Sequence, residues 1–438
     1  MSRDEGTAPG RRLLVVADSD SYAKWGAALA GRVAGAWDTE FALLASPVLP
    51  SARQLDAALA GSGFVPAEVR TIELDALLAE LAADPPDAVL LALRGPLVRV
   101  VAGRIAGLPN RPVLVSGFPG LTIPAEPKAV VYRELVDLVV LHSRREVREF
   151  RANAAALDVG VRFGLATLPF LAAVPPSAWV GPERDELVFA AQAKVPAGFE
   201  DRVRLLGMLA RAARAHPDHR VVLKVRARPG EAQTHAEEFD LGELVAAPPP
   251  ELLAMTGGEL PANLVVRDGP MAGHLESAAA LVTVSSTAVL EAIAVGVPVL
   301  LLDDFGIGPK QINTVFEGSG LFGGAADLVA GRWREPAPGW LGDNYFHGEE
   351  HDDWEAELAR LVDARARAPL PAPVRRHNLV GGALRRAYER KRMLGDYDRT
   401  PAGAVAMVVA LPARWLLRRV RRVRAAVTRS APCAPRGA

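Results

Sequence analysis

Residues 280–303 read ALVTVSSTAVLEAIAVGVPVLLLD, and this stretch decides the fold. The apolar run 281–284 predicts a buried strand, and a hydroxyl triplet at 285–287 follows it directly. Residues 288–295 predict a short helix, and residues 299–302 predict the next strand. Strand, turn, helix and strand in close succession are the repeating unit of a parallel α/β sheet, so this stretch predicts one such unit.

The rest of the chain repeats this alternation of short apolar runs with longer stretches of helical spacing. The expected strands are 13–17, 41–45, 68–74, 88–93, 112–117 and 138–142 in the first half, and 187–192, 221–225, 264–267, 281–284 and 299–302 in the second. The expected helices include 21–34, 53–61, 74–83, 351–368 and 379–393, while 333–346 is expected to be irregular.

Two series of strands predict an α/β protein with two doubly wound, Rossmann-like domains that face each other across a cleft. The expected divisions are an N-terminal domain at 1–175, a proline-rich hinge at 171–182, a C-terminal domain at 183–345, surface helices within 346–400 and a basic tail at 401–438. The two domains share their architecture without obvious sequence identity.

The composition is that of a soluble globular protein. The chain has 438 residues, of which 50% are hydrophobic and 23% charged, so it is long and apolar enough to form two hydrophobic cores of ordinary size. Its one cysteine, Cys433, excludes a disulfide or a cysteine-based metal site within one chain. The N-terminus lacks an apolar signal segment, and no window resembles a membrane-spanning helix. We therefore expect a cytoplasmic protein.

The charges are unevenly distributed although the formal net charge is zero. The tail 401–438 contains eight arginines and no acidic residue, so the rest of the chain carries eight net negative charges. An acidic body is a poor ligand for nucleic acid. Within the tail, 403–424 predicts an amphipathic helix that binds an anionic membrane at the inner face of the plasma membrane. A disordered or partner-docking tail is the alternative.

The hydroxyl triplet Ser285, Ser286 and Thr287 predicts a seat for phosphate oxygens. Hydroxyls and unpaired backbone N–H groups at a helix start are suitable donors to phosphate. Glu291 lies one helical turn further on, on the same face, within an otherwise apolar helix. We expect its carboxylate to accept hydrogen bonds from a ribose; an acid that merely complements the helix dipole is the alternative.

Cationic side chains are predicted beside this seat. Strand alternation places Lys224, Arg226 and Arg228 on one side of an extended segment that ends at a Pro-Gly turn. These cations would neutralise a diphosphate or a carboxylate-bearing sugar; a solvated strand face is the alternative. Gln192 and Asp268 follow two other strands, so they are further candidates for contact with a nucleotide donor.

The pattern Ser-Ser-Thr-Ala-x-x-Glu-Ala-x-x-x-Gly-x-Pro-Val at 285–299 resembles the donor-binding element of GT-B glycosyltransferases. It is similar in style to bacterial polysialyltransferases, Kdo-type capsule transferases and CDP-glycerol polymerases. The chain as a whole is similar, over 10–345, to a group of actinobacterial glycosyltransferases. The resemblance implies that the triplet binds donor phosphates, that Glu291 binds the ribose, and that the donor is a nucleotide-activated sugar, with a cytidine-linked one favoured.

One position departs from the resembled pattern. Polysialyltransferase-like families often have Lys-x-His-Pro where this chain has Arg228 before Pro229, and the histidine there serves the leaving phosphate. Arg228 is expected to take over this role, and His235 lies seven residues further on. No cofactor beyond the sugar donor is implied, and the implied acceptor is an envelope, capsular or lipid-linked glycan.

Two carboxylates follow the first strand. An inverting transferase needs a base that deprotonates the acceptor hydroxyl, and Asp18 and Asp20 lie where the strand meets the cleft. We expect Asp20 to be this base, because Asp18 is suited to order the turn or cap the helix that opens near Lys24. Ser21 is another candidate cap. In the alternative interpretation both acids are turn and cap residues.

Glycine-containing loops close two other strands of the first domain. Gly95-Pro96 and 116–120 are expected to line the acceptor side, with Arg94 as an anion contact. We expect no metal, because the Asp18-x-Asp20 pair has no further ligand nearby. The cluster of His347, His351, Asp352 and Asp353 is interpreted as a solvated helix start.

The sequence therefore predicts an inverting, metal-independent glycosyltransferase that uses a nucleotide-activated sugar. Two other functions stay open at this point. One is a nucleotide-sugar epimerase, which shares the two-domain scaffold and would act without an acceptor. The other is a catalytically silent scaffold at the membrane, which would bind the donor without turnover.

Overall fold

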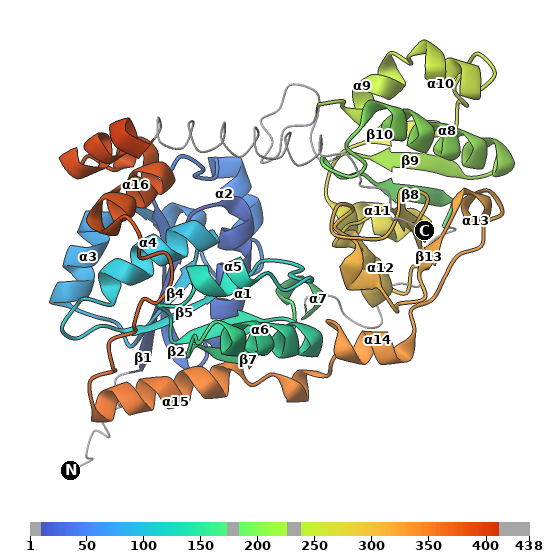
Figure 1. Ribbon diagram of the computed structural model, residues 1–438. Coiled ribbons are helices and arrows are strands. Elements are labelled where there is room, and N and C mark those ends of the chain that lie inside the picture. Colours follow the sequence, from blue (N-terminus) through green and yellow to red (C-terminus); the bar gives the residue numbers. More distant parts are fainter. Residues whose placement is uncertain (1–9, 173–183, 226–237, 411–438) are drawn as a thin grey trace, which may run out of the picture.

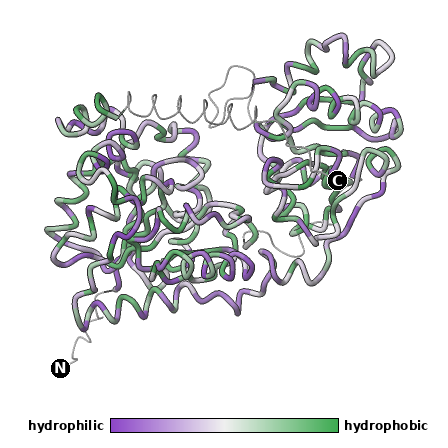
Figure 2. The backbone as a smooth tube through the Cα atoms, viewed as in Figure 1, coloured by the Kyte–Doolittle hydropathy of each residue, from purple (hydrophilic) through white to green (hydrophobic). Residues whose placement is uncertain are grey.

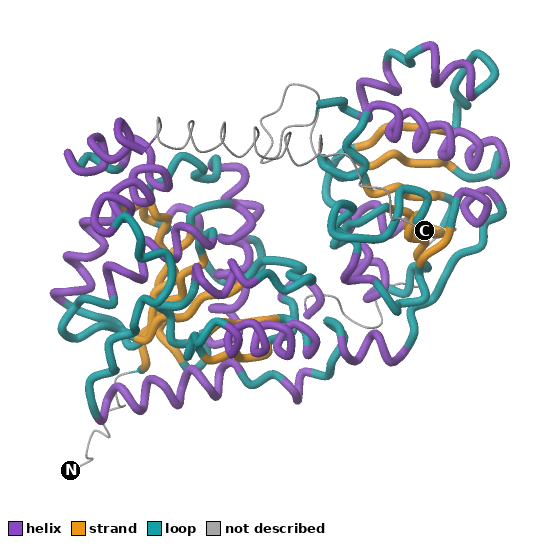
Figure 3. The backbone as a smooth tube through the Cα atoms, in the orientation of Figure 1, coloured by secondary structure: helices purple, strands orange, loops and turns teal. Residues whose placement is uncertain are grey.

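The computed structural model describes residues 10–172, 184–225 and 238–410 of the chain. Two parallel sheets form two lobes, and each sheet is a middle layer between helices (Figures 1 and 3). Hydrophobic residues gather along the strands, whereas the outer helices mix hydrophobic and hydrophilic positions (Figure 2). The predicted α/β architecture of two doubly wound domains is confirmed.

The first sheet has seven strands. From one edge to the other they are β3 (Arg70–Ile72), β2 (Trp37–Leu44), β1 (Arg11–Ala17), β4 (Ala88–Ala92), β5 (Val113–Gly117), β6 (Leu138–Leu141) and β7 (Arg162–Leu165). All neighbours pair in parallel. Every residue of β4 is buried because helices cover both faces of the sheet, which explains its uninterrupted apolar sequence.

Helices from distant parts of the chain complete both faces of this sheet. One face packs against α3 (Leu74–Ala83), α4 (Gly95–Ile105), α5 (Pro127–Tyr132), α6 (Arg144–Ala156) and Leu394 of α16 (Gly382–Leu394). The other face packs against α1 (Asp20–Val33), α2 (Ala52–Leu59) and α15 (Trp354–Arg367). The C-terminal helices α15 and α16 therefore belong to the first lobe, which Figure 1 shows in orange and red beside the blue elements.

The second sheet has six strands in the same winding order. They are β10 (Leu264–Arg267), β9 (Arg220–Lys224), β8 (Glu186–Ala190), β11 (Ala278–Thr283), β12 (Val299–Leu302) and β13 (Phe322–Gly323). One face packs against α8 (Phe199–Ala215), α9 (Leu241–Ala246), α10 (Pro250–Met255) and α13 (Ala325–Val329). The other packs against α11 (Met271–Ser277), α12 (Ala288–Ala294) and α14 (Pro338–Asp343).

The predicted strands are all present with shifts of a few residues at their ends, and two strands were not predicted, β7 and β13. The expectation that 333–346 is irregular is wrong in part, because α14 begins with Pro338 in its first turn, where proline is well tolerated. The expected hinge begins in α7 (Pro169–Ala172), and its larger part lies outside the described residues. In the part of the chain that the structure describes, no helix is long and apolar enough to cross a membrane.

Candidate functional site

Both sheets change winding direction at one pair of strands, and the candidate residues gather at the carboxyl ends of these strands. In the first sheet the pair is β1 and β4, and in the second it is β8 and β11. Loops that leave such a pair diverge to opposite faces and leave a crevice where ligands of doubly wound proteins bind. Asp18 and Asp20 follow β1, while the hydroxyl triplet follows β11.

The three hydroxyls of the triplet differ in their surroundings. Ser285 is buried, and its Oγ donates a hydrogen bond to the Ile312 carbonyl at 2.6 Å. Ser286 is half-buried, and its Oγ accepts from the Ala288 N–H at 3.2 Å. Thr287 is exposed and precedes α12. Ser285 therefore anchors the loop, and only Ser286 and Thr287 present hydroxyls that a ligand can reach.

Glu291 lies in the first turn of α12 and is half-buried. Burial raises the pKa of its carboxyl, and the charges of Lys24 and Lys224 partly oppose this shift. Lys24 belongs to α1 of the first lobe, whereas Lys224 ends β9 of the second. The charges of one cation from each lobe therefore act on this carboxylate.

The other predicted donor residues divide into three groups. Lys224 is at the carboxyl end of β9, in register with Ala190 of the switch-point strand. Arg226 and Arg228, like His235, lie outside the described residues. The carbonyls of the two remaining candidates have protein partners: Gln192 O accepts from Arg202 Nη2 at 3.4 Å, and Asp268 O bonds His274 Nε2 at 2.9 Å.

The two acids of the first domain also differ. Asp18 is completely buried, and Arg94 donates to it from its backbone N–H at 3.2 Å and from Nε at 2.6 Å. Burial raises the pKa of Asp18, and Arg94 opposes this shift. Asp20 is half-buried in the first turn of α1, where Ser21 Oγ donates to it at 3.4 Å.

Several expectations about this loop need correction. The helix begins at Asp20, within one residue of the predicted 21–34 and before the opening expected near Lys24, because Ser19 adopts the extended N-cap conformation and Asp20 complements the positive helix end. Asp18 orders the loop through Arg94 and does not cap the helix. Arg94 was predicted as an anion contact for a ligand, but the anion that it contacts is Asp18.

Packing requires two of the glycines that were expected to admit a ligand. A Cβ at Gly95 would lie 2.7 Å from Tyr132 Cδ2, and one at Gly117 would collide with the indole ring of Trp25. Gly120 is different, because its Cβ position lies 3.9 Å from Thr287 Cγ2 of the other lobe. The 118–120 end of this loop therefore faces the triplet across the interface.

A core contact joins the lobes next to the candidate site. Ile123 and Leu168 of the first lobe are buried in the same cluster as Val289 and Leu290 of α12. A buried hydrogen bond adds to this contact: Glu146 of the first lobe is fully buried and accepts a hydrogen bond from Tyr345 Oη at 2.7 Å. These contacts pack α12, which directly follows the triplet, against the first lobe.

The cluster around His347 lies at the start of α15, as predicted, and His351 and Asp353 are exposed there, but His347 and the side chain of Asp352 are not solvated. Asp352 is nearly buried and accepts from Thr167 N at 2.8 Å, Arg32 Nη2 at 2.6 Å and His347 Nε2 at 3.0 Å. Asp353 accepts from the Leu165 N–H at 2.6 Å, at the open edge of β7. The two acids therefore fasten the returning chain to the first lobe. Among the described residues, no group of three or more His, Cys, Asp and Glu side chains is arranged to hold a metal ion.

Lys24 is the residue that sequence reasoning missed. It lies four residues after Asp20 on the exposed face of α1, and its charge acts on Glu291 of the other lobe. The spacing from Asp20 was visible in the sequence. Its approach to Glu291 depends on how the two lobes pack, which no local pattern encodes.

The raised pKa of Glu291 predicts how its replacement affects stability. A carboxyl whose pKa is raised in the folded state loses stabilising free energy as the pH rises above its ordinary value of 4.5. We expect Glu291→Gln to gain melting temperature relative to the wild type as the pH rises above 4.5. Thermal unfolding of both proteins across this range measures it, and a difference that is constant with pH would contradict it.

Similar solved structures show the same fold. A putative UDP-N-acetylglucosamine 2-epimerase from Listeria monocytogenes is 13% identical, with a TM-score of 0.51, over 82% of this chain and 97% of that one. The S. aureus MnaA–UDP co-structure is 12% identical, with a TM-score of 0.50, over 80% and 95%. The fold is GT-B. No curated protein matches the chain. Residues 13–361 match a family model over most of the sequence, and the chain therefore belongs to the family described as "Putative glycosyltransferase (DUF6716)".

Proposed function

We propose that the protein is an inverting, metal-independent glycosyltransferase that moves a sugar from a nucleotide-activated donor to an envelope, capsular or lipid-linked glycan. Family membership and the GT-B fold support a nucleotide-sugar enzyme. The observation that carries the proposal is that Glu291 lies one helical turn after an accessible hydroxyl loop and that charges of both lobes, those of Lys24 and Lys224, act on its carboxylate. A nucleotide offers hydroxyls for the carboxylate and phosphates for the cations.

The donor would lie on the second lobe. Ser286 and Thr287 donate to its phosphates, Glu291 accepts from the ribose hydroxyls, and Lys224 and Lys24 neutralise charge that develops on the leaving nucleotide. Arg226 and Arg228 are proposed to add to this neutralisation. Ser285 contributes by holding the loop through Ile312.

Asp20 would act as the base on the first lobe. A general base must reach the proton that it removes, and Asp20 is accessible at the start of α1. Asp18 is less suited, because its carboxylate is buried and engaged by Arg94. Asp18 would instead fix the position of the loop that carries Asp20.

The basic tail would bring this enzyme to its acceptor. Most of the segment 403–424 lies outside the described residues, so its membrane binding is proposed from its amphipathic sequence and its clustered arginines. The enzyme would then act as a peripheral protein at the inner face of the plasma membrane.

A nucleotide panel tests the donor site. CMP, CDP, UDP, GDP and TDP are added to the protein and the melting temperature is measured, since a ligand at 100 times its Kd stabilises by about 2.7 kcal/mol. UDP is included because the S. aureus neighbour is a UDP co-structure, and the cytidine nucleotides because of the resemblance at 285–299. A panel without any shift would overturn the proposed donor site.

Glu291→Gln is expected to weaken binding of the best nucleotide by about 10- to 100-fold, because hydrogen bonds to a charged group contribute about 1.5–3 kcal/mol. Isothermal titration calorimetry measures the affinity. Glu276→Gln is the matched control, since Glu276 is an exposed acid of the same lobe on α11. Equal losses in both variants would contradict the role of Glu291.

Turnover separates the transferase from the other two functions. The nucleotide sugar is incubated with and without glycan acceptors, and its products are resolved by mass spectrometry and NMR. A transferase releases the nucleotide only with an acceptor, apart from slow hydrolysis. If the nucleotide sugar is epimerised without an acceptor, the protein is an epimerase and the proposal is wrong. If the donor binds but no product forms, the protein is a silent scaffold.

A further inference from the structure

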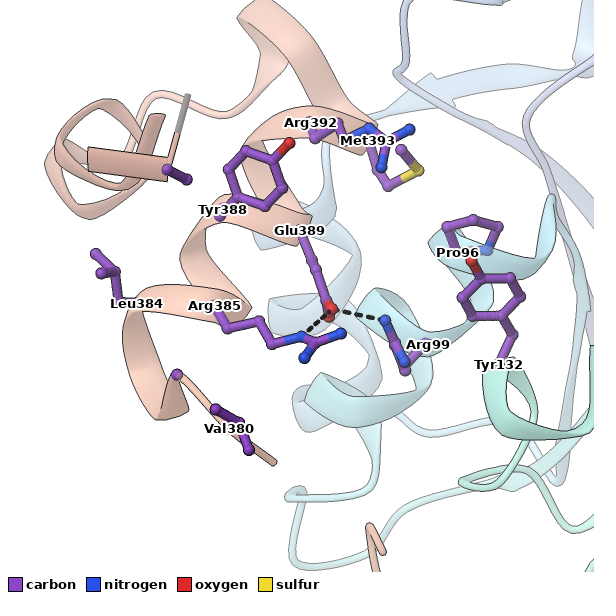
Figure 4. A pocket seen from close by; sticks show the side chains of 12 residues that line it. Pro96, Arg99, Tyr132, Val380, Leu384, Arg385, Tyr388, Glu389, Arg392 and Met393 are labelled. Carbon is purple, nitrogen blue, oxygen red and sulfur yellow. Dashed lines mark hydrogen bonds and ion pairs between the residues drawn. The ribbon is translucent and has the colours of Figure 1, made fainter. Parts of the chain in front are cut away.

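A pocket of about 490 Å³ lies on the first lobe, between α4, the end of α5 and α16. Figure 4 shows Arg385, Tyr388 and Arg392 of α16 on one side of it, and Arg99 and Tyr132 on the other. None of the residues predicted to bind the sugar donor lines this pocket.

Arg99 is the buried polar group of the pocket. Only 6% of its surface is exposed, and its Nη2 donates to Glu389 Oε1 at 2.6 Å. Among the described residues its Nε and Nη1 find no hydrogen-bond partner, although both are buried. Burial lowers the pKa of Arg99. A guanidinium in this state has donors to spare for a ligand with several acceptor oxygens.

The pocket has more positive than negative charge. Glu389 is shared by three guanidinium groups, those of Arg99 at 2.6 Å, Arg385 at 3.0 Å and Arg375 at 3.5 Å. Arg392 lines the pocket at its exposed rim, whereas Arg375 does not line it. Three guanidinium groups, those of Arg99, Arg385 and Arg392, therefore stand against one lining carboxylate, so the pocket favours an anion, and the planar donors of arginine suit phosphate oxygens.

Exposed aliphatic side chains surround this cationic pocket. Val380 is 86% exposed and Leu384 is 42% exposed, and both line it. The helical residues 401–410 reach the pocket at Ala410 and expose three valines as well. Most of the exposed large hydrophobic side chains of the described residues belong to the C-terminal segment 374–410 that contains α16; they are Val374, Leu379, Val380, Leu384, Tyr397, Val405, Val408 and Val409. Such a concentration marks a surface that another apolar phase covers.

We propose that this pocket binds the phosphate group of an anionic membrane lipid, while the surrounding aliphatic side chains enter the bilayer interface. A phosphate directly attached to apolar chains matches a cationic pocket with an apolar rim. Pro96, which lines the pocket, is two residues from Arg94 at the β1–β4 switch point. A lipid bound here would hold the first-lobe loops at the membrane surface. This inference does not depend on the proposed sugar transfer.

Vesicle flotation of the full chain tests the charges of the pocket. Phosphatidylcholine vesicles with and without phosphatidic acid are compared for Arg392→Gln and for Arg386→Gln, a matched control. Both arginines are exposed on α16, but only Arg392 lines the pocket. Arg392→Gln is expected to weaken binding to the phosphatidic acid vesicles about fivefold more than the control does. Equal effects of the two variants would overturn the proposal.

A soluble lipid removes the contribution of the basic tail. Monomeric short-chain phosphatidic acid offers no surface for an amphipathic segment, so calorimetry reports the pocket. We expect saturable binding that is lost in the double variant Arg385→Gln/Arg392→Gln and kept in Arg376→Gln/Arg386→Gln. Melting temperatures establish that both double variants are folded. Binding that is the same in the two double variants would overturn the site.

The apolar rim is tested separately. Val380→Ser/Leu384→Ser is expected to weaken vesicle flotation several-fold while Val65→Ser, an exposed valine far from α16 in sequence, leaves it unchanged. Inorganic phosphate is added as a competitor for the short-chain lipid. Full competition together with unchanged flotation of the rim variant would mean a site for soluble phosphate, and the membrane part of the proposal would be wrong.

Discussion

Replacing Asp20 by asparagine is expected to lower kcat for sugar transfer by about 100- to 10,000-fold, the range that loss of a general base commonly costs. The amide keeps the shape of the side chain and its place in the first turn of α1, but it cannot take the proton of the acceptor hydroxyl. Nucleotide affinity should change little, because the proposed donor residues other than Lys24 are on the other lobe. Initial rates of nucleotide release with acceptor, together with calorimetry, measure the two quantities.

Asp56→Asn is the matched control for this experiment. Asp56 is an exposed acid of the same lobe on α2, and its replacement removes the same charge. Asp18→Asn is the informative comparison, since Asp18 is expected to act through the position of the loop. Full activity of Asp20→Asn combined with loss of activity in Asp18→Asn would assign the base to Asp18.

The second large effect concerns stability. Asp352→Ala is expected to lower the free energy of unfolding of the first lobe by about 1–3 kcal/mol, the cost of leaving buried donors without their acceptor. The substitution deprives Arg32 and His347 of their acceptor and removes the fastening at Thr167. Urea denaturation followed by hydrogen exchange locates the loss, which should appear in the first lobe and spare the second.

The matched control is Asp343→Ala. Asp343 pairs with Arg148 at 2.6 Å, but this pair is exposed, and such pairs contribute about 0–1 kcal/mol.

The pH dependence of the stability is a further check on the role of Asp352. Burial alone would raise the pKa of Asp352, but hydrogen bonds from His347 and Thr167 and the Arg32 guanidinium lower it. Its stabilisation is therefore present above its ordinary value of 3.8 and fades as the pH falls through the lowered one. If Asp352→Ala still lowered the free energy of unfolding in strong acid, this account would be wrong.

Local sequence patterns predicted the architecture more completely than they predicted the candidate site. Buried parallel strands are short apolar runs, so β1, β4 and β12 were predictable from composition alone. β7 was missed because Arg162 and Gly164 interrupt its apolar character. The glycine is needed because a Cβ there would lie 2.8 Å from Trp354 Cα, and that contact joins positions 190 residues apart.

The individual residues of the candidate site could be predicted from the sequence, but their contacts with one another could not. The triplet at 285–287 and Glu291 were visible as a motif, and Asp18 and Asp20 as acids after a strand. The engagement of Asp18 by Arg94 and the approach of Lys24 to Glu291 depend on strand order and on the packing of the lobes. Sequence spacing holds no information on either, so the roles of equivalent-looking residues could not be separated beforehand.

The return of the chain to the first lobe determines the order in which the protein can be completed during synthesis. Trp354 and Leu358 of α15 and Leu394 of α16 are buried in first-lobe cores, whereas the second sheet uses residues 186–323. A nascent chain can therefore finish its second sheet while the first lobe still waits for its last helices. Domains usually mature in the order of their synthesis. Here the lobe that is begun first is finished last, and a chain whose synthesis stops before Leu394 would have a complete second sheet and an incomplete first lobe.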